Sequence, residues 1–413
     1  MAQFAVSEEF STGQLPMQVS RSTHISARRR GWRALAASAA FVVVAAVAGC
    51  TSQPAAETAS PSGSPSIEGA LPAALQAELQ AAVDETVMQY DVPGAVAGVW
   101  IPGEGSWTTA VGLADIENGT PTTTDMSWPL RSVTKSYTVT LLLQLVDEGK
   151  LSLDDPISEY VDGVTNGDQI TLRQLAGMSS GNADYINDDF IEVFSADPTR
   201  IFTLDELNSF VLGKPAQFEP GAEHVYTNAN TNLLGAVVEK VTGQPFAEVL
   251  NERILAPLGL TDTKYILDVT TWTQPHALGY GPNADPREPM DQNFSIFGPA
   301  GSMVSTLDDS QLWAQALASG ELLQASTQTE REQGAPLDSG PPYDQYALGI
   351  GETNGWWGHN GEGLGYTAAV FSNPQTGASI VVFTNESNVA DKAHPADQTF
   401  RRLAEILEKG TTK

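Results

Sequence analysis

The sequence predicts an α/β fold of the α+β kind, in which an antiparallel sheet is flanked by N- and C-terminal helices and carries an inserted all-helical subdomain. Strand-like runs lie at both ends of the folded part, at 93–101 and within 366–383. Apolar residues at helical spacing occur outside these runs, over 71–90 and 400–407. The part between them, roughly 136–294, has helical patterns and long loops with few β-branched runs. Strands at both ends with helices between them indicate a sheet that packs on terminal helices and holds a helical subdomain.

The strands are predicted from β-branched and small apolar residues bounded by turn signals. Residues 93–101 are rich in Val and Ala and end at a Pro-Gly pair, and 108–113 can form the hairpin partner. Near the C-terminus, 366–371 and 380–383 are two further strand-like runs. The segment Asn-Pro-Gln-Thr-Gly at 373–377 joins them, which is typical of a hairpin.

The helices are predicted from apolar periodicity and from the glycines that end it. Residues 71–90 carry apolar side chains every three or four positions, and 132–146 form a long apolar-faced segment that stops at Gly149. Residues 233–241 make one helical face that Gly243 closes. The last periodic segment of the chain predicts a C-terminal helix.

The first 49 residues predict a secretory signal. Arginines within 28–33 precede an uncharged run rich in Ala and Val, 34–49, which is shorter than the ~20 residues of a membrane span. The run ends in Val-Ala-Gly-Cys, and Cys50 is the only cysteine of the chain. This tetrapeptide resembles the bacterial lipobox, which implies that Cys50 becomes the lipidated first residue of the mature protein. We therefore expect an exported lipoprotein, anchored to the outer face of the cytoplasmic membrane through its lipid only; a plain cleaved signal is the alternative.

Composition sets further limits on the chain. Residues 50–70 are rich in Ser, Pro, Ala and Gly, so we expect a flexible tether before a folded domain over 71–413. With 50 Asp and Glu against 21 Lys and Arg, the formal net charge is −29, a field that repels nucleic acid and anionic lipid headgroups. Once Cys50 carries the anchor, no cysteine is left for an intrachain disulfide, so stability must come from the core. The sequence leaves the start codon and the oligomeric state open.

Ser132 and Lys135 are the candidate nucleophile and base. They stand three residues apart at a predicted helix start, so they share one helix face about 4.5 Å apart along the axis. A serine hydroxyl needs a nearby base before it attacks, and burial lowers the pKa of a lysine so that it can serve. The helix N-terminus also directs backbone N–H groups at the serine oxygen. On this tetrapeptide alone, an ordinary exposed Ser and Lys at a helix start is the simpler interpretation.

Two later segments carry further candidate residues. Tyr226 and Asn228 lie in a loop that leads into a helical segment. A tyrosine held near a cationic lysine loses its proton more easily and can share the base role, and an asparagine amide can donate to a substrate carbonyl. The alternatives are a half-buried aromatic and a helix cap. The segment 358–361, Gly-His-Asn-Gly, opens onto the strand at 366–371. Small residues there let a substrate approach a strand edge, and a backbone N–H can complete an oxyanion hole. The alternative is a glycine-rich turn between two strands.

The order S-x-x-K, then Y-x-N about 90 residues later, then H-x-G about 130 residues after that, resembles one known superfamily. It is the serine β-lactamase-like or penicillin-binding superfamily, which includes class C β-lactamases and D-alanyl-D-alanine carboxypeptidases. The resemblance covers about residues 71–407. Further landmarks that resemble the superfamily are 145–151, 153–156, 170–175 with Ser180 and Gly181, Pro220 with Gly221, 233–235, 255–260, and Ala300 with Gly301 before Ser305.

The resemblance implies a serine hydrolase that forms an acyl-enzyme and needs no metal or cofactor. Ser132 would attack a carbonyl, Lys135 and Tyr226 would share proton transfer, and Asn228 would hold the substrate amide. The expected activity is that of a D-alanyl-D-alanine carboxypeptidase-like peptidase on cell-wall peptide, so the expected partner is a peptide or β-lactam-like small substrate. A β-lactamase, an esterase or D-aminopeptidase, and a non-catalytic penicillin-binding sensor remain alternatives.

The third motif departs from the superfamily pattern. The resemblance implies that His359 replaces a lysine of many relatives, that Gly361 opens the strand edge, and that the backbone N–H groups of Ser132 and Glu362 form the oxyanion hole. Glu362 stands where a Thr or Ser would help to hold a substrate carboxylate, and an acid there repels one. Carboxylate recognition is therefore either weak or depends on a cation from the helical subdomain, for which Arg173 and Arg287 are candidates.

A rival motif, Gly-Met-Ser-Ser-Gly at 177–181, fits the G-x-S-x-G nucleophile elbow of α/β-hydrolases. That elbow needs a buried strand directly before it and a helix directly after it. Here Leu172 and Leu175 precede the motif at helical spacing and a polar segment follows. We interpret the match as chance.

Overall fold

A computed structural model of the chain describes residues 67, 69–281, 287–290, 292–387 and 394–411. All of them belong to one compact unit, Ser64–Lys413. The expected signal over 1–49 and the expected lipidation site Cys50 lie outside the described residues. Ala70 pairs with Ser106 in an isolated parallel bridge, so the chain joins the fold just before the end of the expected tether. Within the described residues, no helix combines the length and the apolar composition that crossing a membrane requires.

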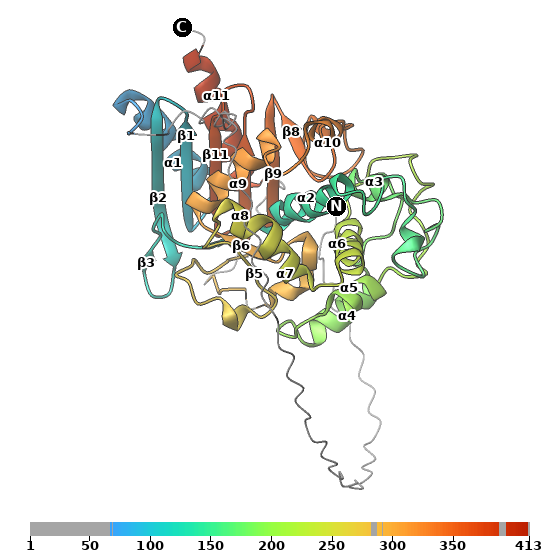
Figure 1. The fold of residues 1–413 in the computed structure, drawn as a ribbon. Helices are drawn as coiled ribbons and strands as arrows, with labels where there is room; N and C mark the ends of the chain where they lie inside the picture. The colour runs from blue at the N-terminus through green and yellow to red at the C-terminus, as the bar shows by residue number, and fades with distance from the viewer. Residues whose placement is uncertain (1–66, 68, 282–286, 291, 388–393, 412–413) are drawn as a thin grey trace, which may run out of the picture. The chain divides into compact units, whose positions relative to one another are not determined.

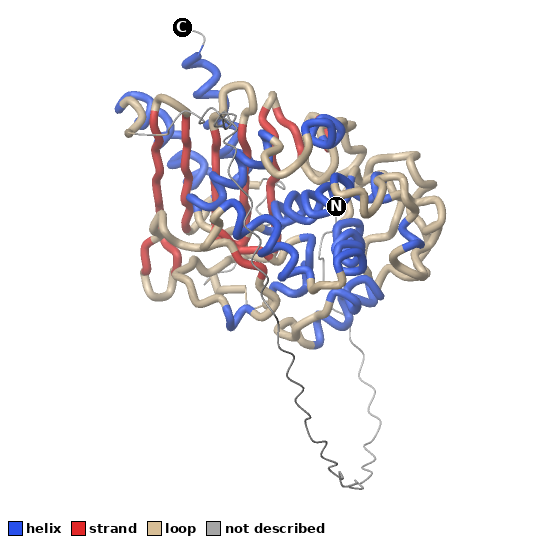
Figure 2. Tube along the Cα trace, viewed as in Figure 1, coloured by secondary structure: helices blue, strands red, loops and turns tan. Residues whose placement is uncertain are grey.

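An eight-stranded sheet forms the centre of the molecule, in the order β3-β2-β1-β11-β10-β9-β8-β7 with antiparallel neighbours throughout. Its strands are β1 (Gly94–Ile101), β2 (Gly105–Asp115), β3 (Thr120–Pro121), β7 (Gln345–Tyr346), β8 (Gly351–Thr353), β9 (Trp356–Gly363), β10 (Tyr366–Ser372) and β11 (Ser379–Thr384). β1 pairs with β11, so strands from the two ends of the chain lie side by side in mid-sheet (Figure 2). The predicted antiparallel sheet and its C-terminal hairpin are confirmed.

Helices cover both faces of this sheet (Figure 1). The three helices on it are α1 (Ala73–Tyr90), α9 (Leu307–Ser319) and α11 (Pro395–Thr411). α1 and α11 pack together on one face, and α9 packs on the other. Alternate residues of β11 enter the two cores: Ile380 and Val382 on the α1/α11 side, Val381 and Phe383 on the α9 side. Because both faces are covered, the strand is a continuous apolar run and not an alternating one.

The remaining helices lie mainly between β4 and β7 in the sequence. They are α2 (Thr134–Asp147), α3 (Leu172–Ala176), α4 (Asp188–Ala196), α5 (Leu204–Ser209), α6 (Asn228–Thr242), α7 (Phe246–Leu250), α8 (Ala256–Leu258) and α10 (Ala325–Arg331), with the short turns η1 (Arg131–Val133), η2 (Ile157–Glu159), η3 (Asn251–Leu255), η4 (Val269–Thr271) and η5 (Phe294–Ala300). Every residue of α2 from Thr134 to Leu143 is buried, and α6 packs against it. The terminal helices and the helical insertion agree with the sequence pattern.

A second, three-stranded sheet has the order β4-β6-β5. Its strands are β4 (Trp128–Pro129), β5 (Lys264–Tyr265) and β6 (Met303–Ser305). β5 belongs to the segment that was expected to be wholly helical. It pairs with β6, which is fully buried and whose backbone groups therefore need partners on both edges. A two-residue strand is too short to leave a periodic signal in the sequence.

Candidate active site

Ser132 lies in η1, the turn directly before α2. Its neighbours Arg131 and Val133 are buried, whereas Ser132 keeps part of its surface accessible. The backbone N–H of Leu130 donates to the Met303 carbonyl at 2.8 Å, which ties the turn to β6. Arg131 has a φ of 50°, in the left-handed region that non-glycine residues rarely adopt. This tied and strained turn presents Ser132 at the end of a buried helix.

Lys135 lies one turn further along and is fully buried. Its Nζ lies 2.9 Å from Ser132 Oγ, 2.8 Å from Asn228 Oδ1 and 3.0 Å from the Ala300 carbonyl oxygen. Burial lowers the pKa of Lys135 to about 7, against the opposing attraction of the Asp184 carboxylate. A large fraction of the neutral amine is therefore present near neutral pH.

The three partners of Lys135 determine where its lone pair points. A neutral amine has two N–H bonds and one lone pair. Asn228 Oδ1 and the Ala300 carbonyl only accept hydrogen bonds, so both N–H bonds are directed at them. The Ser132 hydroxyl is the one partner of the three that can donate, so the lone pair faces it. In this state Lys135 is placed to take the Ser132 proton.

Asn228 is the first residue of α6, but its side chain does not cap the helix. Instead, Asp184 accepts from the backbone N–H groups of Asn228 and Ala229, each at 3.3 Å, and from Asn228 Nδ2 at 3.3 Å. The amide nitrogen of Asn228 therefore faces Asp184 and its oxygen faces Lys135. Its second N–H bond has a direction of its own and is available to a substrate carbonyl.

Tyr226 packs its ring beside this amine, with Lys135 Nζ 4.9 Å from the ring centroid. Its hydroxyl oxygen is buried and lies close enough to Ser132 to interact with it, although it makes no direct hydrogen bond of good geometry. Burial raises the pKa of Tyr226 well above its ordinary value. The resting tyrosine is therefore a neutral phenol, which can donate a proton, and the base role rests with Lys135.

His359, from β9, is fully buried behind Tyr226. Its Nε2 bonds the Tyr346 hydroxyl at 3.1 Å, and its Nδ1 lies 3.2 Å from the Tyr343 hydroxyl and 2.5 Å from the Asn360 carbonyl. Burial, with the Lys135 charge as a smaller contribution, lowers the pKa of His359 to about 3. The imidazole of His359 is therefore neutral near pH 7, and both of its nitrogens already have hydrogen-bond partners.

Gly361 is where β9 meets the nucleophile turn. A Cβ atom at this position would lie 2.3 Å from the Leu130 carbonyl oxygen and 3.1 Å from the Ser132 nitrogen, so only glycine fits without a shift of backbone. β8 pairs with residues 356–358 alone, so within the described sheet the rest of this edge of β9 has no strand partner. The Glu362 side chain points to the other face, where its carboxylate lies 3.0 Å from His394 Nε2. The backbone of Glu362 stays beside Ser132 while its charge lies on the far face of the strand.

A sequence model of the family described as Beta-lactamase matches residues 79–404. The chain belongs to the beta-lactamase family. Its eight-stranded sheet and helices match solved structures of this fold, among them D-amino acid amidase from Ochrobactrum anthropi SV3 at a TM-score of 0.72 and 26% identity, covering 82% of this chain and 100% of that one.

Two curated relatives are also similar in sequence. The chain is 32% identical over 228 residues to D-aminopeptidase from Brucella anthropi, covering 55% of this chain and 42% of the relative. It is 33% identical over 195 residues to Esterase EstB from Burkholderia gladioli, covering 44% of this chain and 50% of the relative. The matches thus span about half the length of these relatives.

The two arginines that the sequence offered for carboxylate recognition are both engaged elsewhere. Arg173 pairs with Asp154 at 3.2 Å and with Glu330 at 2.7 Å on the surface. Arg287 pairs with Asp91 at 2.6 Å and with Glu386 at 2.8 Å. Neither is among the side chains that contact Ser132 or Lys135.

The rival elbow motif at 177–181 follows helix α3 and not a strand. Ser180 is buried and its hydroxyl donates to Asn230 Oδ1 at 2.8 Å. The motif therefore joins α3 to the start of the helical insertion, in agreement with the interpretation as chance.

Sequence reasoning missed Asp184 and the two tyrosines that hold His359. Asp184 is a single acid in a polar loop, and no spacing pattern links it to Lys135 49 residues earlier. Its place shortly after the Ser-Gly landmark at 180–181 is the one signal that the sequence carries for it. Within the described residues, no group of three or more His, Cys, Asp or Glu side chains is arranged to hold a metal ion.

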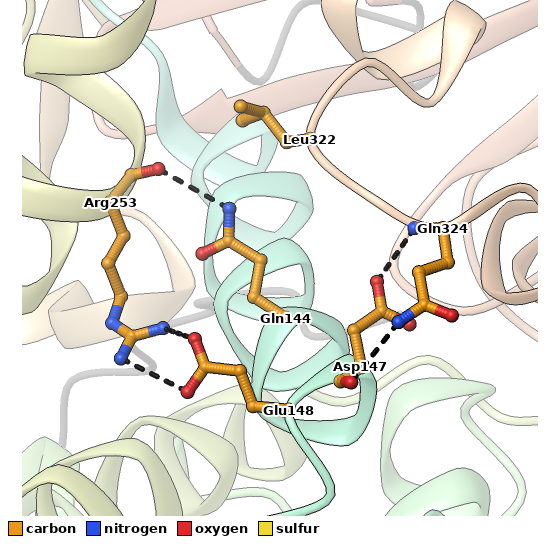
Figure 3. A pocket seen from close by; sticks show the side chains of 6 residues that line it. All are labelled: Gln144, Asp147, Glu148, Arg253, Leu322 and Gln324. Carbon is orange, nitrogen blue, oxygen red and sulfur yellow. Dashed lines mark hydrogen bonds and ion pairs between the residues drawn. The ribbon is translucent and has the colours of Figure 1, made fainter. Parts of the chain in front are cut away.

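A separate hollow of about 390 Å³ lies at the far end of α2 (Figure 3). Its lining residues are Gln144, Asp147, Glu148, Arg253, Leu322 and Gln324. Their polar groups bond one another: Arg253 pairs with Glu148 at 2.6 Å, and the Gln324 backbone N–H donates to Asp147 at 2.8 Å. None of the candidate catalytic residues lines it.

Proposed function

We propose that this protein hydrolyses an amide bond at the carbonyl of a D-amino acid, through an acyl-enzyme on Ser132. The observation that carries the proposal is the fully buried Lys135, whose Nζ lies 2.9 Å from the Ser132 hydroxyl oxygen. The stereochemical preference is inferred from the similarity to D-aminopeptidase and to D-amino acid amidase.

The proposed reaction has two halves. Lys135 takes the Ser132 proton as Oγ attacks the carbonyl carbon, and the oxyanion is held by the backbone N–H groups of Ser132 and Glu362. The C–N bond then breaks, and the leaving amine receives a proton from Lys135 or through the Tyr226 phenol. In the second half, a water molecule attacks the ester carbonyl carbon and loses a proton to Lys135. The C–Oγ bond then breaks, Lys135 returns the proton to Ser132 Oγ, and the acid leaves. Asn228 donates its remaining N–H to the substrate amide, and Gly361 leaves room for the substrate beside β9.

Charge supports a substrate with a free amino group. The chain has a net charge of −29, and such a field attracts cations and repels anions. An amino acid amide carries an ammonium and no carboxylate, whereas a D-Ala-D-Ala peptide ends in a carboxylate. With Arg173 and Arg287 both paired to acids, support for carboxylate binding does not come from these two residues.

A D-alanyl-D-alanine carboxypeptidase, the activity first expected from the sequence, is the second candidate. The lipobox-like segment ending at Cys50 favours it, because a protein anchored outside the cytoplasmic membrane meets cell-wall peptide. The lipid anchor is itself a proposal: an alkyne fatty acid fed to the producing cells is expected to label the wild-type protein but not Cys50→Ser, and equal labelling of both contradicts it.

The substrates are separated by one panel: D- and L-phenylalaninamide, a D-Ala-D-Ala peptide, nitrocefin and a p-nitrophenyl ester. We expect the highest kcat/KM for the D-amide among the amides and peptides, with no turnover by Ser132→Ala. Preferred turnover of the D-Ala-D-Ala peptide establishes the second candidate instead. Equal rates for the D- and L-amides contradict the proposed stereochemistry.

A further inference from the structure

Asp184 is a half-buried carboxylate in the loop between α3 and α4, surrounded by hydrogen-bond donors. One oxygen accepts from the backbone N–H groups of Tyr185 at 2.8 Å and Ala229 at 3.3 Å. The other accepts from the backbone N–H and from Nδ2 of Asn228, both at 3.3 Å. These donors favour the ionised carboxylate, while burial acts against them and raises the pKa of Asp184 above its ordinary value. Asp184 thus caps α6 from 44 residues upstream in the sequence.

The same carboxylate sets the orientation of the Asn228 amide. An asparagine amide has an accepting and a donating end that are nearly equal in shape. A carboxylate accepts only, so Asp184 holds the nitrogen end and leaves the oxygen end to Lys135, 2.8 Å away. A flipped amide would present N–H to Lys135. The lone pair of the amine would then be drawn to Asn228, and Ser132 would lose its base.

The charge of Asp184 acts on Lys135 in the opposite sense, because it favours the ammonium over the neutral amine. The other titratable neighbours of Lys135 are Tyr226 from the loop before α6 and His359 from β9. Both are neutral, since burial raises the pKa of the phenol well above its ordinary value and lowers the pKa of the imidazole to about 3. The Asp184 carboxylate, by contrast, raises the pKa of Lys135 against the larger effect of burial.

We propose that Asp184 is a positioning residue that, through Asn228, aims the lone pair of Lys135 at Ser132. The proposal deepens the proposed function and rests on the roles given there to Ser132 and Lys135. Asp184 has no hydrogen bond to Ser132 within the described residues; it acts by fixing which end of an amide the lysine meets. Its negative charge also raises the pKa of Lys135 against the larger effect of burial.

The test is the rate at which a fluorophosphonate probe phosphonylates Ser132, with an Oγ–P bond formed and fluoride lost, followed by mass spectrometry from about pH 5 to 9. Asp184→Asn removes the charge and permits the Asn228 flip. We expect its rate of phosphonylation at the high-pH plateau to fall about tenfold, the loss of roughly one oriented hydrogen bond. We also expect the acid limb of its pH–rate profile, the part in which the rate rises with pH, to move to lower pH. The reason is that the charge that raised the pKa of Lys135 is gone. Asp184→Glu keeps the charge, so its limb should stay near that of the wild type.

Asp309→Asn is the matched control. Asp309 is a buried carboxylate on α9 that accepts from the Asp262 N–H at 2.8 Å and the Thr263 hydroxyl at 2.9 Å, without a contact to the site. Its limb should not move and its plateau should stay within about twofold of the wild type.

Three results overturn the inference. They are a folded Asp184→Asn with the wild-type limb and plateau, an equal change in Asp309→Asn, or a limb of Asp184→Glu displaced to lower pH. If circular dichroism shows that Asp184→Asn is unfolded, the acid limb of Asp184→Glu, compared with that of the wild type, decides by itself whether the inference holds. A wild-type protein that is not labelled on Ser132 overturns the proposed function itself, and this inference with it.

Discussion

At the scale of single residues, the Lys135 amine and the groups that accept its hydrogen bonds explain how Ser132 can be activated. Lys135 has three polar partners, two of which can only accept, and this leaves one direction for its lone pair. A buried cation with no partner would be expensive, and burial instead shifts the pKa to about 7. The residue is therefore a base because its surroundings disfavour the ammonium.

The pH dependence of acylation follows from this pKa. The active form is the neutral amine, so the acylation rate should rise about tenfold per pH unit below the pKa and level off above about pH 7. Stopped-flow release of p-nitrophenol from an ester measures it. Lys135→Arg stays charged at all these pH values, and we expect its plateau rate to fall by about 10²–10⁴-fold. A wild-type acylation rate that does not change between about pH 5 and 9 contradicts the assignment of Lys135 as base.

At the scale of elements, the site depends on how closely β9 approaches the turn η1. The two elements are in direct contact, and Gly361 lies where the Leu130 and Ser132 backbones come nearest. Within the described residues, β9 has no strand partner on this edge beyond residue 358, and the Tyr343 hydroxyl accepts from the Asn360 backbone N–H there at 2.9 Å. The third motif is thus explained by backbone approach more than by side-chain chemistry.

Gly361→Ala tests this packing. The added methyl meets the Leu130 carbonyl at 2.3 Å, a distance that only a backbone shift relieves. We expect acylation of Ser132 to fall by about 10²-fold, because a shift of about 1 Å at a reacting centre has that effect. Gly410→Ala, in α11 with open space around its Cβ, is the control and should acylate at the wild-type rate. Equal rates for Gly361→Ala and the control would show that the approach of β9 is not needed.

At the scale of the whole molecule, the two ends of the chain meet in one sheet and the site lies beside the part inserted between them. β1 pairs with β11, and α1 and α11 close the face behind them. Phe371 of β10 stacks on Phe400 of α11 with ring centroids 4.1 Å apart. This core lies on the opposite face of the sheet from α9.

Phe400→Ala separates stability from chemistry. It leaves a large cavity in the α11 core, and we expect the free energy of unfolding to fall by about 3–5 kcal/mol. The acid limb of acylation should stay in place, since the ring contacts of Phe400 are with Trp356 and Phe371, and neither bonds Ser132 or Lys135. Urea denaturation and the pH profile of the folded fraction measure the two quantities. A displaced limb would mean that the α11 core and the environment of Lys135 are coupled.

The sequence predicted β1, β2, β10, β11 and the terminal helices, because long periodic runs reflect burial directly. It also placed Ser132, Lys135, Tyr226 and Asn228 in one site through their order and resemblance. It did not predict β9, whose glycines at 358, 361 and 363 interrupt a strand pattern. It did not reveal β5, whose pairing is too short for a pattern, or Asp184, whose contacts join distant segments. Nor did it show that His359 is fully buried and neutral, since that depends on tyrosines brought together by the sheet.

Peptide mapping by mass spectrometry after brief exposure to a fluorophosphonate tests the central claim, that Ser132 is a nucleophile activated by Lys135. We expect one adduct, on the peptide that contains Ser132, formed by the wild-type protein and lost in Ser132→Ala. We expect Lys135→Arg to form the same adduct about 10²–10⁴-fold more slowly. An adduct that persists in Ser132→Ala, or forms at the wild-type rate in Lys135→Arg, would contradict the account.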